Sequence, residues 1–213
     1  MQNAIELENV TKRIGQEVLL NKINLVIPAG QIVGIVGQNG SGKSMLFKAI
    51  AGLIHITEGN VRVWEKDIGK HGNFPDDSGF LIERPGFLPH MSGMKNLEIL
   101  AGIQKKIGRE EIKETMRLVG LDPDLNRSFA KYSLGMKQKL GIAQALMEKP
   151  RLLVLDEPMN NLDEESIARL RKILMELNQK ENVTVLMTSH DAQDIRTLCG
   201  SVYSIQNGVM NVM

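Results

Sequence analysis

The sequence predicts an α/β fold that is built on a parallel sheet. Three compact apolar runs, at residues 31–36, 152–155 and 183–187, have the aliphatic content of strands that are buried on both faces. The charged segment 164–179 has helical periodicity and lies between the last two runs, where a parallel pair needs a crossover helix. With 213 residues, of which 42% are hydrophobic, the chain can bury a core, and we expect one domain over residues 1–213.

The remaining elements are predicted from apolar spacing and turn residues. We expect strands at 5–10 and 18–27, a helix at 43–53, helices between 94 and 120, a helix from Ser133 to Glu148, and a hairpin of strands 201–205 and 209–213 around Asn207 and Gly208. The middle of the chain is helical and charged, without a strand-like run, between the two halves of the α/β core. Residues 83–150 are therefore predicted to be an inserted α-helical subdomain.

Composition excludes several classes of protein. The formal net charge of +1 gives no general attraction to a polyanion, so we expect no nucleic-acid partner. A single cysteine, Cys199, excludes an internal disulfide and a metal cluster of thiolates. No run approaches the roughly 18 apolar residues of a membrane span, and the first ten residues, with Glu6 and Glu8, are unlike a signal peptide. We expect a cytoplasmic protein, which would need a second chain for any work across a membrane.

The first chemical motif is Gly37-Gln-Asn-Gly-Ser-Gly-Lys-Ser44, which fits G-x-x-x-x-G-K-[ST] between a predicted strand and a predicted helix. Its glycines let successive backbone N–H groups point at one phosphate, at the N-terminus of the helix. Lys43 is expected to reach the β- and γ-phosphates, and the Ser44 hydroxyl to bind Mg²⁺. The nucleotide-binding residues predicted in this segment are Gly37, Asn39, Gly40, Ser41, Gly42, Lys43, Ser44 and Met45.

Acidic residues and a histidine follow two of the predicted parallel strands. Asp156 ends the run 152–155 and is predicted to be a second ligand of Mg²⁺. Glu157 comes next, where a general base can polarise the attacking water. His190 follows the run 183–187, at the edge where such sheets bind ligands. It either bonds the γ-phosphate or orients Glu157, or it has only a structural role in its loop.

A second anion site is predicted at Ser133. This residue is a good N-cap for the helix that follows, and Gly135 allows another backbone to approach closely. A helix N-terminus with a hydroxyl attracts phosphate. Because the first motif already holds a nucleotide, the second site serves a nucleotide on another copy of the chain, unless the segment is an ordinary capped helix.

These elements, in this order, resemble the nucleotide-binding subunit of an ATP-binding cassette (ABC) transporter over nearly the whole chain. Residues 37–44 match the Walker A motif, 152–156 the Walker B motif and 160–163 the D-loop, and Ser133-Leu-Gly-Met-Lys stands in the place of the LSGGQ signature. The resemblance implies a P-loop NTPase core with a parallel sheet, an antiparallel β-subdomain and the inserted α-helical subdomain.

The resemblance also implies the catalytic cycle. It assigns Glu157 as the catalytic carboxylate and His190 as the switch histidine, which act together with Lys43. It implies a head-to-tail homodimer with two ATP molecules and Mg²⁺ at the interface. There, Ser133 and Gly135 of one copy touch the γ-phosphate that the other copy holds, and Asp163 of the D-loop belongs to the same nucleotide-binding set.

Three features of the sequence depart from the family pattern. Ile14 stands where an aromatic residue usually stacks on adenine, so base selectivity is expected to be weak and GTP is a second candidate. The signature differs at Tyr132, Leu134 and Met136, although its phosphate-contacting serine and glycine remain. Glu83 replaces the Q-loop glutamine and keeps an oxygen ligand for Mg²⁺. A glutamate here, with Pro-Gly-Phe after it and Tyr-Ser-Leu-Gly-Met-Lys-Gln later in the chain, resembles the sequences of bacterial exporters for bacitracin resistance and lantibiotic immunity, unless the glutamate is a neutral replacement in an unrelated branch.

We therefore expect an ATPase that drives transport through a separate integral membrane permease, from the inner face of the cell membrane, with peptide antibiotics or related drugs as cargo. The apolar segment 84–96 either docks on that permease or packs against its own core. One alternative is a soluble ABC-type ATPase with a non-transport macromolecular partner, and another is a P-loop kinase outside the family. The chain ends at Met213, directly after the predicted hairpin, so we expect no regulatory C-terminal domain.

Overall fold

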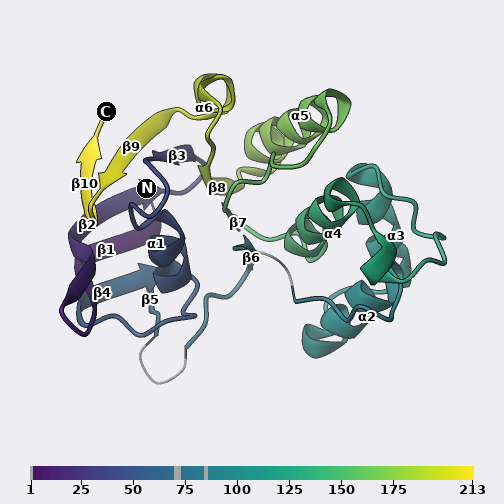
Figure 1. Cartoon of the computed structure of the whole chain (residues 1–213), viewed down its shortest axis with the longest axis horizontal. Coiled ribbons are helices and arrows are strands. Elements are labelled where there is room, and N and C mark those ends of the chain that lie inside the picture. Colours follow the sequence, from purple (N-terminus) through teal and green to yellow (C-terminus); the bar gives the residue numbers. More distant parts are fainter. Residues whose placement is uncertain (1, 70–72, 84–85) are drawn as a thin grey trace.

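The computed structural model describes residues 2–69, 73–83 and 86–213, and it contains two sheets (Figure 1). The antiparallel sheet has the strand order β2-β1-β4-β5. Its strands are β1 (Asn3–Ile14), β2 (Glu17–Pro28), β4 (Glu58–Val63) and β5 (Lys66–Asp67). The larger sheet has the order β10-β9-β3-β8-β7-β6 and is parallel from β9 to β6. Its strands are β3 (Ile32–Val36), β6 (Ser78–Leu81), β7 (Leu152–Leu155), β8 (Thr184–Thr188), β9 (Ser201–Gln206) and β10 (Val209–Val212).

The helices divide between the parallel sheet and the middle of the chain. Three of them follow strands of the parallel sheet: α1 (Lys43–Ile50), α5 (Glu164–Glu181) and α6 (Ala192–Leu198). The middle of the chain forms α2 (Gly93–Gln104), α3 (Arg109–Leu118), a short 3₁₀ helix (Phe129–Lys131) and α4 (Leu134–Leu146). Figure 1 shows α2, α3 and α4 grouped at the end of the molecule opposite the antiparallel sheet. The predicted α/β fold with a parallel sheet and an antiparallel unit is confirmed.

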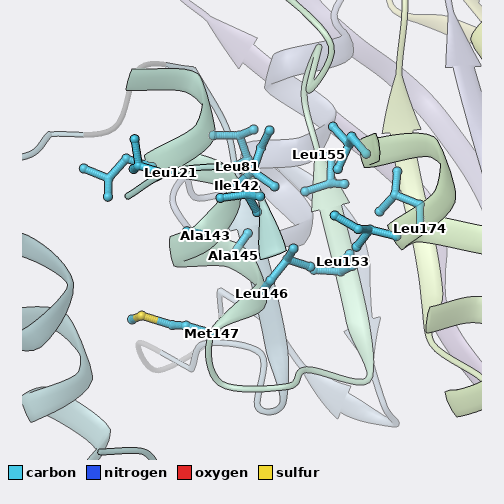
Figure 2. Close-up of a cluster of buried hydrophobic side chains, with 14 of the residues drawn as sticks. Leu81, Leu121, Ile142, Ala143, Ala145, Leu146, Met147, Leu153, Leu155 and Leu174 are labelled. Atoms are coloured by element: carbon cyan, nitrogen blue, oxygen red, sulfur yellow. The ribbon is translucent and has the colours of Figure 1, made fainter. Parts of the chain in front are cut away.

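The helical group joins the parallel sheet through a closely packed contact between α4 and β6. Leu81 of β6, Ile142 and Leu146 of α4, and Leu153 of β7 belong to one buried cluster (Figure 2). Gly79 of β6 makes this contact possible, because a Cβ atom there would lie 1.9 Å from the backbone oxygen of Ala145. The strand and the helix therefore meet backbone to backbone at this point.

Some elements were not predicted, because their sequences lack the apolar runs on which the prediction depends. β4 contains Gly59 and Asn60, which are typical of turns and gave no strand signal. Pairing with β1 holds this segment in a strand despite its composition. β6 has four residues, one of them Gly79, and β5 has only two. The helix predicted at 43–53 ends at Ile50, before Gly52 in the left-handed region at φ 73°. α6 was also absent from the prediction.

The segment that follows Glu83 contacts its own chain at Phe87 and Asn96, while Gly86, Leu88, Pro89 and His90 are exposed. Phe87 is buried, with its ring 5.1 Å from that of Phe129 in an edge-on arrangement. The Asn96 side chain accepts from the backbone N–H of Leu88 at 2.7 Å and donates to its carbonyl at 3.2 Å. Of the segment predicted to dock or to pack inward, residues 84 and 85 lie outside the described residues. Of the rest, the structure favours inward packing for Phe87.

Two further expectations concern single features. Among the described residues, no helix combines the length and the apolar content that a bilayer span requires. Cys199 packs as a partly buried side chain against the core, and burial raises the pKa of its thiol to about 12.

Candidate nucleotide site

The phosphate loop lies between β3 and α1, as its motif predicts. Its curvature requires glycine at two positions. Gly42 adopts φ 110°, and a Cβ atom there would lie 2.8 Å from the backbone oxygen of Leu19. A Cβ atom at Gly37 would lie 2.3 Å from the backbone oxygen of Ile205. The loop ends where α1 begins at Lys43, so the free N–H groups at the start of that helix can bind an anion in the loop.

Lys43 is held inside the loop that it serves. Its side-chain ammonium donates to the carbonyl oxygens of Gly37 at 2.8 Å and Gln38 at 3.0 Å, and the residue is only 8% exposed. A phosphate group that enters the loop competes with these carbonyls for the ammonium. The lysine is therefore already placed where the predicted β- and γ-phosphate contacts would form.

Asp156 is bonded on both of its carboxylate oxygens. The Ser44 hydroxyl donates to Oδ2 at 2.6 Å, and the Thr188 hydroxyl donates to Oδ1 at 2.7 Å. The backbone N–H of Glu157 donates in turn to the Thr188 oxygen at 2.8 Å. Thr188 is fully buried and was not predicted as a site residue. The pairing register of β7 and β8 explains its position. Leu155 pairs with Met187, so Asp156 and Thr188, the residues that follow them, lie side by side.

Glu157 faces His190 across a short gap. The Glu157 Oε1 atom lies 3.1 Å from the His190 Nε2 atom, which is the distance of an ion pair. This oxygen is buried, and no described group gives it a well-aligned hydrogen bond. Burial is the largest cause that raises the pKa of Glu157; nearby Asp156 acts in the same direction, and His190 and Lys43 act against it. A carboxylate with a raised pKa is a stronger proton acceptor, which suits a general base.

These side chains open into one cavity of about 320 Å³. The cavity is lined by Leu19, Asn39, Gly40, Gly42, Lys43, Ser44, Met45, Asp156, Glu157 and His190. The structure thus brings the predicted phosphate loop, both acidic residues and the histidine together. Ile14 is not among the lining residues: it is 57% exposed at the end of β1, whereas Leu19 reaches the cavity.

The sequence matches the ABC transporter family over residues 20–160. The chain belongs to the ABC transporter family. It is 36% identical to the bacitracin transport ATP-binding protein BcrA of Enterococcus faecalis, over 98% of this chain and 68% of that protein. It is 32% identical to the lantibiotic transport ATP-binding protein SrtF of Streptococcus pyogenes, over 96% of this chain and 87% of that protein.

Solved structures agree with this assignment. The dimeric ATP-binding cassette MJ0796, in a post-hydrolysis state bound to ADP and Pi, aligns with a TM-score of 0.87 and 25% identity, over 98% of both chains. The protein is thus an ATP-hydrolysing enzyme of the ABC transporter family, in which such subunits drive transport through membrane permease components.

The ABC signature lies outside this cavity in the same chain. Ser133 caps α4, with its hydroxyl accepting from the N–H of Met136 at 3.2 Å. A Cβ atom at Gly135 would lie 2.8 Å from the backbone oxygen of Asn161, so the glycine admits the D-loop of its own chain. The side-chain amide of Gln138 donates to the Glu157 carbonyl at 3.1 Å. The signature helix α4 therefore lies against the backbone of the D-loop and is hydrogen-bonded to the backbone of Glu157, the candidate base.

Asp163 and Tyr132 each have a structural partner in this chain. The Asp163 carboxylate accepts from the N–H of Ser166 at 2.8 Å and caps α5, and the hydrogen bonds from Ser166 lower the pKa of Asp163. The Tyr132 hydroxyl, at a departure from the family signature, accepts from the N–H of Gly93 at 3.1 Å. A Cβ atom at Gly93 would lie 2.7 Å from this hydroxyl, so tyrosine and glycine fit each other.

Glu83 lies apart from Ser44 and Asp156. Its carboxylate pairs with the Lys48 ammonium of α1 at 2.5 Å, and its side chain is 57% exposed. Glu83 adopts a left-handed φ of 57°. The structure does not bring it among the residues that line the cavity.

Proposed function

We propose that this ATPase powers the export of peptide antibiotics or related drugs through a separate permease, from the cytoplasmic face of the cell membrane. The observation that carries the proposal is likeness over nearly the full chain to ATP-binding proteins named for bacitracin and lantibiotic transport. The site supports the energy-supplying half of this role, because it gathers a phosphate loop, two carboxylates and a histidine around one cavity.

The roles of the cavity residues follow from their positions. Lys43 and the loop N–H groups bind the β- and γ-phosphates, and the hydroxyls of Ser44 and Thr188 hold the Asp156 carboxylate in place. Glu157 accepts a proton from the attacking water, and His190 holds the carboxylate and the γ-phosphate in place. The hydroxyl of Ser44 and the carboxylate of Asp156 are hard oxygen donors that fit Mg²⁺. When bound, Mg²⁺ supplies positive charge that offsets the charge on the phosphates.

The proposed active form is a head-to-tail homodimer. Ser133 and Gly135 lie outside the cavity of their own chain, while Ser133 begins a helix whose N-terminus attracts anions. In the dimer, these residues and Asp163 face the nucleotide that the partner copy holds. The dimeric form of the related cassette MJ0796 supports this arrangement.

Glu83 is proposed to act on the nucleotide and its metal after leaving Lys48. Replacing Glu83→Gln is expected to lower ATP hydrolysis several-fold, because the amide keeps an oxygen but loses the charge that Mg²⁺ favours. The Lys48→Gln variant breaks the same ion pair and keeps the carboxylate, so it should hydrolyse ATP at least as fast as the unmodified chain. Phosphate release by the two purified variants is the measurement. Equally lowered rates in both variants would show that Glu83 matters only through its ion pair. Unchanged rates in both would show that the carboxylate has no special role.

Loss of the chain from its host is expected to sensitise the cell to bacitracin or to a lantibiotic. Complementation with the unmodified gene should restore the minimal inhibitory concentration, whereas the Lys43→Ala gene should not, because its product cannot grip the phosphates. Membrane fractionation of the complemented cells should place the chain with a hydrophobic partner. Unchanged sensitivity, together with a chain that co-purifies with a non-membrane complex, would favour a soluble ABC-type ATPase instead.

A further inference from the structure

A buried ion pair lies directly behind the loop that carries His190. Asp194, in the first turn of α6, has a side chain that is 2% exposed. Arg171 of α5 donates to its Oδ1 atom through Nε at 2.8 Å and also through Nη2. The Ser189 hydroxyl donates to Oδ2 at 2.7 Å. Both oxygens of the Asp194 carboxylate therefore accept hydrogen bonds. One bonds Arg171, and the other bonds Ser189, the residue before His190.

The Ser189 hydroxyl fastens both flanks of His190. It donates to Asp194 and accepts from the backbone N–H of Asp191 at 3.1 Å, so one oxygen atom holds the residues on either side of the histidine. One residue earlier, Thr188 is bonded to Asp156, as described above. The backbone that carries the imidazole is therefore tied at two points, and the ring is left to face Glu157 at 3.1 Å.

Helix capping does not account for this arrangement. The N-cap of α6 is Asp191, whose carboxylate accepts from the N–H of Gln193 at 2.7 Å. A carboxylate that served only the helix N-terminus would remain exposed, since burying a charge is costly unless it is paired. Asp194 is instead buried against an arginine of another helix. What the buried charge adds is a fixed acceptor for Ser189.

We propose that Ser189 and Asp194 are positioning residues for ATP hydrolysis, which hold the His190 imidazole toward Glu157 and the γ-phosphate. Arg171 anchors them to α5, about two helical turns after Asp163. A shift of α5 that starts at the D-loop therefore reaches His190 through Arg171, Asp194 and Ser189. This inference rests on the proposed role of His190, and the experiment separates the two.

Ser189→Ala is the sharpest variant, because it removes one hydroxyl and leaves the ion pair of Arg171 and Asp194 intact. We expect kcat to fall about tenfold, the equivalent of one well-placed hydrogen bond, while KM for ATP stays unchanged. The melting temperature should fall by only a few degrees, because Arg171 still pairs with the buried Asp194. Ser189→Thr keeps the hydroxyl and should restore kcat. Ser78→Ala is the matched control, because it also removes a serine hydroxyl that donates one hydrogen bond, here to the Asp76 carbonyl. Ser78 lies in β6, at the edge of the sheet and separated from β8 by β7.

The decisive measurement is a double-mutant cycle with His190→Ala, followed by single-turnover hydrolysis with enzyme in excess. If Ser189 acts through His190, Ser189→Ala costs nothing further once the imidazole is gone. An equal fall in both backgrounds, or an unchanged kcat in Ser189→Ala alone while His190→Ala is inactive, would overturn the positioning role and leave the role of His190 standing. A His190→Ala protein that hydrolyses ATP at the full rate would instead overturn the proposed role of His190.

Asp194→Asn provides a second, independent variant. It keeps the shape of the side chain but removes the charge that pairs with Arg171, so we expect the same loss of kcat together with a lower melting temperature. A lower melting temperature with an unchanged kcat would show that the ion pair stabilises the fold without positioning His190.

Discussion

Replacing Glu157→Gln is expected to abolish ATP hydrolysis and to leave ATP binding intact. The amide keeps the size of the side chain but cannot accept the proton of the attacking water, and general-base catalysis contributes about a thousandfold to such reactions. Phosphate release should therefore fall by about that factor. In the presence of Mg²⁺ and ATP, light scattering should show a shift from monomer to dimer, because the closed state cannot be reset.

The Glu181→Gln variant is the control for this experiment. Glu181 is an exposed carboxylate at the far end of α5, so its replacement changes the charge by the same amount without entering the cavity. Hydrolysis within a few-fold of normal in Glu157→Gln would show that another group activates the water. Lost hydrolysis without a dimer would separate the chemistry from the proposed association, and an ATP-binding titration would then show whether nucleotide capture had failed.

Gly79→Ala is expected to destabilise the folded chain strongly. The new methyl group would lie 1.9 Å from the Ala145 carbonyl oxygen, far inside van der Waals contact, so β6 and α4 must separate. Overpacking of this kind costs about 3 kcal/mol in the free energy of unfolding. For a domain of this size, we expect the melting temperature to fall by about 10 °C, measured by circular dichroism. Hydrolysis at low temperature should also fall, because α4 carries the signature to its position.

Gly102→Ala is the matched control for the glycine substitution. Gly102 lies within α2, where an added Cβ atom meets nothing within 4 Å. Alanine is the better helix former by about 1 kcal/mol, so this variant should be as stable as the unmodified chain or more stable. If both variants melted at the normal temperature, the backbone contact between β6 and α4 could not be as close as the structure shows.

The phosphate loop and the two acidic residues were predictable because each is a local pattern. The phosphate-binding residues 37–44 are consecutive in the sequence. Asp156 and Glu157 directly follow the apolar run 152–155, which predicts a strand that ends there. The structure gathers these residues into one cavity with His190. Local order, charge and strand polarity were sufficient to predict that they meet at one edge of the sheet.

Other parts of the site depend on tertiary pairing that no local pattern encodes. Thr188 completes the bonding of Asp156 only because β7 and β8 pair in a particular register. Lys48 of α1 and Glu83 are 35 positions apart in the sequence, so their ion pair depends on the tertiary fold. Gly135 was predicted to admit another backbone, but its neighbour within the chain, Asn161, follows from how α4 packs. The roles of Ser133 and Asp163 toward a nucleotide need a second chain and stay predictions.

The contacts that join the signature helix to its own Glu157 give the proposed dimer a means of cooperativity. Gln138 of α4 holds the backbone of Glu157 by a hydrogen bond, and Ser133 lies at the start of the same helix. In the proposed dimer, Ser133 would face the nucleotide of the partner copy. Binding of a nucleotide at one site of the proposed dimer would therefore affect, through α4, the position of Glu157 at the other site. We expect the rate of hydrolysis by such a coupled dimer to rise more steeply with ATP concentration than the rate of two independent sites. A dimer with one disabled site should lose more than half of its turnover.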